Sequence, residues 1–94
     1  MAQQYLARVE LHYATDQDYD RLHDHMAGVG FGRSIWLNGM GEHWLPTGTY
    51  VTSSEKPLQG VFADAQQAAN RTGKTNELIV AVAPGTLSGG LKKK

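Results

Sequence analysis

Hydrophobic and polar residues alternate along the first part of the chain with the period of two that is typical of a strand with one buried face. The odd-numbered side chains from residue 5 to residue 13 are mostly apolar, whereas the other set includes Arg8, Glu10 and His12. The pattern predicts a strand over residues 5–13. If helices cover only one face of its sheet, the polar row Arg8, Glu10 and His12 is left exposed.

Two later segments show apolar residues at spacings of three and four, which predict helices packed along one stripe. The first follows Thr15 and Asp16, either of which can cap a helix, and it ends near Gly28 or Gly30. The second ends at Gly73. The predicted stripes are Tyr19, Leu22, Met26 and Val29 in the first helix, and Leu58, Val61, Phe62, Ala65, Ala68 and Ala69 in the second.

The remaining segments predict three more strands. Residues 31–37 are followed by Asn38-Gly39, the pair that favours a tight hairpin turn into a third strand. Pro46 interrupts that third strand, because proline cannot donate to a ladder, and the strand resumes over residues 49–53. The apolar run over residues 78–83 predicts a buried final strand.

This order of elements predicts an α+β protein of ferredoxin-like βαββαβ order. Such a protein has a four-stranded antiparallel sheet with both helices on one face. We assign residues 1–84 to one domain. Residues 85–94, which contain three glycines and end in three lysines, are predicted to form a flexible basic tail.

Composition narrows the class of protein. The 94 residues include no cysteine, which excludes disulfides and cysteine nucleophiles and fits a cytoplasmic protein. No apolar run is long enough to span a bilayer, so we expect no membrane partner. Nine basic residues balance nine acidic ones, so any binding of nucleic acid must be local. The glycine-dense segment 28–32 has the reverse order of a phosphate-binding loop, which argues against a nucleotide cofactor.

Candidate catalytic residues follow from the requirements of metal-free RNA cleavage, which needs a base, an acid and a cation beside the phosphate. These roles fit His12, His43, Arg8 and Arg33, provided that the first and third predicted strands are neighbours. No cofactor is expected, and dependence on a divalent metal is left open. The acidic residues near the start of the first helix are already explained by their position.

Candidate RNA-binding residues are the aromatic side chains of the hairpin region and a cation on the first strand. Aromatic rings in strands stack on unpaired bases or pack against each other. The predicted RNA-binding set is Arg8, Trp36, Trp44 and Tyr50. The same open sheet face can instead be a solvated surface or the contact with a second copy.

Four short segments stand out along the chain: RVELH (8–12), DYDRLH (18–23), GFGRSI (30–35) and LPTGTY (45–50). Together they resemble the family of the antitoxin endoribonuclease GhoS, a group of small bacterial proteins. The resemblance covers roughly residues 5–83, and it implies a ferredoxin-like fold and an endoribonuclease-like antitoxin of a type V toxin–antitoxin system. Such an antitoxin cleaves the single-stranded mRNA of its toxin. The alternative is a non-enzymatic dimeric interaction or regulatory module that uses the open sheet face.

Overall fold

The computed structural model describes residues 2–37, 39, 41–83 and 92–94. It contains two helices and five strands, and the chain is an α+β protein, as predicted. In chain order the elements are β1 (Gln3–Leu11), α1 (Asp16–Gly28), β2 (Ser34–Leu37), β3 (Gly41–Trp44), β4 (Thr49–Ser54), α2 (Leu58–Asn70) and β5 (Asn76–Val82).

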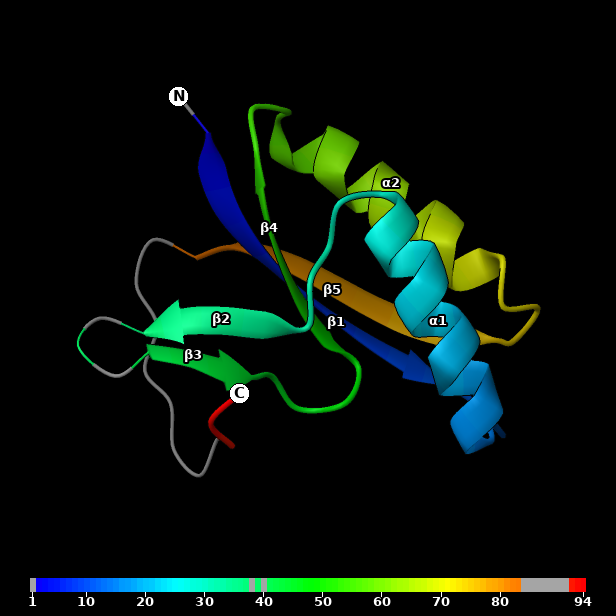
Figure 1. Cartoon of the computed structure of the whole chain (residues 1–94). Coiled ribbons are helices and arrows are strands. Elements are labelled where there is room, and N and C mark those ends of the chain that lie inside the picture. Colours follow the sequence, from blue (N-terminus) through cyan, green and yellow to red (C-terminus); the bar gives the residue numbers. More distant parts are fainter. Residues whose placement is uncertain (1, 38, 40, 84–91) are drawn as a thin grey trace.

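The strands form two antiparallel units rather than one four-stranded sheet. One unit has the order β4-β1-β5, and the other is the hairpin β2-β3. In the described part of the chain they meet at one bridge, where Gly32 and Val51 exchange N–H···O bonds of 2.7 and 2.9 Å. Beyond this bridge the chain leaves the sheet, and the hairpin extends away from it beside β4 (Figure 1).

The predicted break near Pro46 is confirmed, because β3 and β4 are separate strands. Gly48 turns the chain back toward β1 with a φ of +85°, and a Cβ added there would lie 2.5 Å from the carbonyl oxygen of Val9. Only glycine avoids both the strained φ and the clash. The Val9 N–H donates to the Gly48 carbonyl at 2.7 Å, so the turn is tied directly to β1. Asn38 of the predicted hairpin turn lies outside the described residues.

Both helices lie on the same face of the three-stranded sheet (Figure 1). α1 begins where the sequence predicts, because Thr15 caps it: the Thr15 hydroxyl accepts from the Asp18 N–H, and the Asp18 carboxylate accepts from the Thr15 N–H. The odd-numbered residues of β1 meet the two helical stripes in the core. The buried cluster comprises Tyr5, Ala7, Val9, Leu11, Leu22, Met26, Phe31, Tyr50, Val61, Ala65, Ala68 and Ala69.

Three predictions of burial are wrong. Leu58 and Phe62, which are predicted to lie in the packed stripe of the second helix, are 41% and 39% exposed. Tyr13 lies in the turn after β1, at a φ of 53°, and its side chain is almost completely exposed. β5 was expected to be a buried strand, but Ile79 is 67% exposed because the helices cover only the other face. Neither helix in the described part of the chain is long and apolar enough to cross a membrane.

Candidate nucleic-acid interface

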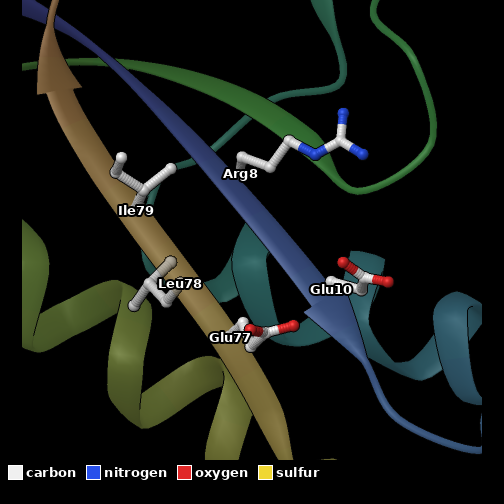
Figure 2. A pocket seen from close by; sticks show the side chains of 5 residues that line it. All are labelled: Arg8, Glu10, Glu77, Leu78 and Ile79. Carbon is white, nitrogen blue, oxygen red and sulfur yellow. The ribbon is translucent and has the colours of Figure 1, made fainter.

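The sheet face opposite the helices carries the polar row predicted from β1. Arg8 and Glu10 are exposed, and in the ladder they lie opposite Ile79 and Glu77 of β5. Figure 2 shows these four side chains on the side of the sheet away from the helices. Together with Leu78 they line a shallow hollow of about 210 Å³. The prediction that no helix covers this row is confirmed. We call this surface the open face.

His12 lies at one end of the open face, just after β1. Its Nε2 atom is 3.1 Å from Oε2 of Glu77. Glu77 lies directly opposite Glu10 in the ladder, so two carboxylates face one another, and the His12 imidazole lies beside one of them. Among the described residues, no group of three histidine, aspartate or glutamate side chains could hold a metal ion.

The β2-β3 hairpin has one exposed and one buried face. Its register pairs Ser34 with Trp44 and Trp36 with Glu42, so these four side chains share a face. On that face Trp36 is 72% exposed and Trp44 is 40% exposed, whereas His43 on the opposite face is buried. The two tryptophans are diagonal neighbours, a separation that aromatic side chains can span.

The last three residues of the chain lie along the free edge of β3 (Figure 1). The Trp44 N–H donates to the Lys92 carbonyl at 2.9 Å, and the Lys94 N–H donates to the Glu42 carbonyl at 3.0 Å. The tail predicted for residues 85–94 therefore has its three lysines paired with the hairpin. Residues 85–91 of that tail lie outside the described residues.

Two cationic side chains lie next to Trp44, and a carboxylate contacts one of them. The Arg33 guanidinium lies 5.5 Å from the centroid of the indole ring, and the Lys94 ammonium lies 4.9 Å from it, both within cation–π range. The Ser34 hydroxyl donates to Glu42 at 2.5 Å, and Lys94 lies 3.4 Å from the same oxygen. These contacts, the Ser34 hydroxyl first, lower the pKa of Glu42. Ionised Glu42 thus holds Lys94 beside Trp44.

The neutral total charge conceals an uneven distribution. The surface formed by Arg33, β2, β3 and residues 92–94 carries four basic side chains and one acidic side chain, and we call it the basic hairpin. The remainder of the chain carries five basic and eight acidic residues. A local excess of cations beside exposed aromatic rings is typical of a surface that binds single-stranded nucleic acid.

The predicted catalytic residues occupy two places. Arg8 and His12 lie on the open face, and Arg33 lies beside Trp44 in the basic hairpin. His43 is buried, with its Nδ1 atom 3.2 Å from the Gly41 carbonyl oxygen. No recorded interaction among the described residues joins His12 to His43, since β3 pairs with β2 and not with β1.

Tyr50 does not lie with the exposed tryptophans, although it was expected in the same RNA-binding set. It is fully buried, and its hydroxyl is 2.6 Å from Nδ1 of His23. Burial raises the pKa of Tyr50; burial, together with the charge of Arg33, lowers the pKa of His23. Because its ring has no exposed surface, Tyr50 cannot stack on a base and instead supports the core. Arg8, the fourth member of that set, lies on the open face.

Sequence reasoning missed the three terminal lysines as part of the same surface as the tryptophans. Their signal is the basic run itself, but its pairing with β3 is a contact between segments far apart in the sequence. No family model, curated protein or solved structure matches the chain. The structure itself therefore defines the class: a small α+β protein with an exposed aromatic and basic hairpin.

Proposed function

We propose that this chain is an RNA-acting domain that binds unpaired bases on the basic hairpin. The observation that carries the proposal is the exposure of Trp36 beside Trp44 within a local excess of positive charge. Stacking of a base on an aromatic side chain contributes about 1–3 kcal/mol and accepts any base. Unpaired bases are required, since the bases of an RNA duplex are already stacked and paired.

The two tryptophans have different roles in this proposal. Arg33 and Lys94 lie over Trp44, and among the described residues no cation is recorded over Trp36. Trp36 is thus the more open platform for a base. In this proposal Arg33 and Lys94, the cations around Trp44, contact the phosphates on either side of the stacked base, and Lys92 and Lys93 of the same segment add further phosphate contacts.

RNA cleavage is the second part of the proposal, and the resemblance to the GhoS-like family supports it. In that reading the chain is an endoribonuclease-like antitoxin of a type V toxin–antitoxin system, acting on single-stranded mRNA. Arg8 and His12 are the accessible candidates for the phosphate-binding cation and the proton-transfer group. The contact between His12 and Glu77 orients the imidazole, as general acid–base catalysis requires.

The ferredoxin-like arrangement belongs to the same proposal. The order β4-β1-β5 corresponds to three strands of such a sheet, and the segment that leads into β2 occupies the place of the fourth. The bridge between Gly32 and Val51 supports this reading, because it lies on the free side of β4. In this reading the fourth strand begins in the segment before β2, and the chain then leaves the sheet and continues as the β2-β3 hairpin.

The open face favours one other candidate function, a non-enzymatic dimeric interaction or regulatory module. Ile79 is a large apolar side chain exposed on this face, opposite Arg8 in the ladder and two residues from Glu77, so charges of both signs lie beside it. A face of this composition suits contact with a second copy or another protein.

Binding of a labelled single-stranded RNA of mixed sequence at low salt tests the RNA-binding part. Both tryptophans of the chain lie in the hairpin, so quenching of tryptophan fluorescence reports directly on this surface. We expect Trp36→Ala to weaken binding by about 5- to 150-fold, the loss of one stacked base. Tyr13→Ala is the matched control, since it removes an exposed ring elsewhere. Equal losses in the two variants, or no binding by the wild type, would favour the interaction module.

Cleavage is tested with the same RNA, in the presence of magnesium and in the presence of EDTA. The expected pattern is that His12→Ala binds RNA as the wild type does but does not cleave it, whereas Trp36→Ala is weakened in both binding and cleavage. Cleavage that survives in His12→Ala would remove His12 from the mechanism. Binding without cleavage by the wild type would leave an RNA-binding domain that is not a nuclease.

A further inference from the structure

β5 is an edge strand with an unpaired outer side. The sheet order β4-β1-β5 leaves one side of β5 without a neighbour among the described residues. The strand has seven residues, and from Leu78 to Val82 it contains no charge and no proline. Natural edge strands of this length usually carry a lysine, a proline or a bulge that prevents pairing with another chain. β5 carries none of these along Leu78–Val82.

The ladder shows which backbone groups of β5 point outward. The His12 N–H donates to the Thr75 carbonyl at 2.8 Å, and the Ala83 N–H donates to the Gln4 carbonyl at 2.9 Å. Hydrogen-bonded pairs alternate along an antiparallel ladder, so the odd-numbered residues of β5 direct their backbone groups toward β1. The N–H and C=O groups of Leu78, Val80 and Val82 therefore point away from the sheet.

Apolar side chains of α2 flank this free edge. Leu58 and Phe62, four residues apart on one side of α2, are both partly exposed. Gln66, the next residue in this row, donates to the Asn76 side chain at 3.1 Å, which places the row on the side of β5. Asp64, on the opposite side of α2, borders a hollow with Val29 at the end of α1.

Most of the large exposed apolar side chains therefore lie on β5 or beside its free edge, with Ile79 on the open face and Leu58 and Phe62 on the helix side. Ile79 is 67% exposed and Val82 is 45% exposed, and both lie on β5. Besides these two, Leu58 and Phe62, the exposed large apolar side chains among the described residues are Tyr13 and the two tryptophans of the basic hairpin. We call the outer side of β5 with Leu58, Phe62, Ile79 and Val82 the edge patch.

We propose that the edge patch binds a second copy of this chain, with the two β5 strands pairing antiparallel about a two-fold axis. The joined sheet has six strands, and the α2 helices of the two copies lie next to each other on one face. Pairing satisfies the outward N–H and C=O groups, and the neighbouring helices cover Leu58 and Phe62. The copies are related by symmetry, so each supplies the same surface to the other.

The charge pattern of β5 favours a copy of itself as the occupant. Glu77 is the only charged residue of the strand. With either Ile79 or Val80 on the two-fold axis, Glu77 lies opposite an alanine of the other copy, Ala81 or Ala83, and the two carboxylates stay apart. In both registers the helix-covered faces of the two β5 strands lie on the same side of the joined sheet, because opposite residues in an antiparallel pair share a face. The apolar centre of the strand then meets itself.

Sedimentation equilibrium of the full chain without RNA tests the proposal. The wild type is expected to approach twice the monomer mass of 10.3 kDa as its concentration rises. Val82→Pro removes an outward N–H from each copy while leaving the bonds between β5 and β1 in place. We expect it to raise the dissociation constant by about 30-fold, from two lost backbone hydrogen bonds per dimer. Ile79→Lys, which places like charges close together across the axis, is expected to have the same effect.

Ser53→Lys is the matched control, because it adds the same charge at an exposed position on β4 of the same face. Hydrogen exchange gives a readout without mutation: the amides of Leu78, Val80 and Val82 should become more protected as concentration rises. A wild type that stays monomeric overturns the proposal. So does a dimer that survives Val82→Pro but is lost in both Ile79→Lys and Arg8→Glu, since that dimer uses the open face, where Ile79 lies opposite Arg8. RNA takes no part in this experiment, so its outcome is independent of the proposed function.

Discussion

The basic hairpin and the edge patch both expose large apolar side chains, but they differ in what surrounds those side chains. In the hairpin the exposed residues are aromatic, Arg33 and Lys94 lie over one ring, and residues 92–94 already pair with the edge of β3. In the edge patch the exposed residues are aliphatic or phenyl, the strand carries one carboxylate, and the outer backbone is unpaired among the described residues. Exposure alone therefore does not specify a partner. The charge and the backbone around it do.

The two surfaces also lie on opposite sides of the three-stranded sheet. The hairpin is attached beyond β4, and the edge patch is on β5, with β1 between them (Figure 1). This separation means that one surface can be changed without touching the other. A variant that weakens RNA binding should leave the monomer–dimer equilibrium unchanged. A variant that weakens the dimer should leave the affinity of each hairpin for RNA unchanged.

The largest expected effect comes from removing the charge of the basic hairpin. Replacing Lys92, Lys93 and Lys94 by serine removes three of its four cations. For single-stranded nucleic acid this lowers the slope of log affinity against log salt by roughly 2, which amounts to about a 100-fold loss of affinity at ~0.1 M relative to ~1 M salt. Titrations at several salt concentrations measure it. An unchanged slope would mean that the lysines do not contact RNA.

The matched control for the lysine variant removes a cation outside the hairpin. Arg71→Ser lies in the turn after α2 and is exposed. It should leave the salt dependence of RNA binding as it is in the wild type. If Arg71→Ser lowered the slope as much per charge as the lysine variant does, the RNA would be attracted by the charge of the whole protein rather than by the hairpin. The contrast between the two surfaces would then be lost.

A smaller effect is expected on the stability of the fold when the pH is lowered, and it arises on the hairpin side of the molecule. Burial and the charge of Arg33 lower the pKa of His23 from 6.5. Below about pH 6.5, His23 therefore binds a proton more readily in the unfolded chain than in the folded chain, which favours unfolding. Stability should therefore fall as the pH drops from about 6.5 through the folded pKa. His23→Gln, which can still bond to the Tyr50 hydroxyl, should reduce this fall.

Urea unfolding of the wild type and of His23→Gln between pH 7.5 and 5.5 measures the difference. Contributions from the other histidines are present in both proteins and cancel in the comparison. The two stability curves should run parallel above pH 7 and separate below it. A fall that is as steep in His23→Gln as in the wild type would show that acid acts elsewhere.

The sequence predicts most elements of this fold because their signals are local. Thr15 caps α1 through atoms three residues away, and Pro46 and Gly48 separate β3 from β4 through their own backbone limits. The row Arg8 and Glu10 follows from the period of a strand. These features need no information about distant segments.

The parts that could not be predicted are those decided by long-range pairing. The point at which the hairpin leaves the sheet depends on how far the segment before β2 pairs with β4, and this pairing ends at Gly32. The burial of Tyr50 and the exposure of Ile79 both depend on which face of the sheet the helices cover. An apolar run such as residues 78–83 has the same appearance in a central strand and in an edge strand.

The smallest expected effect lies next to the edge patch, where Glu10 and Glu77 are directly opposite in the ladder. Like charges in this position destabilise a sheet, and a cross-strand pair changes stability by about 0.2–1 kcal/mol. Glu10→Gln should therefore raise the melting temperature by about 1–8 °C, because it relieves the repulsion and keeps the contact between His12 and Glu77. Glu77→Gln relieves the same repulsion but loses the charged partner of His12, so its gain should be smaller. Both gains should shrink at ~1 M salt, where charges are screened within about 3 Å. Equal gains in the two variants would show that His12 and Glu77 do not stabilise each other, and that contact would then lose its support as an orienting interaction for His12.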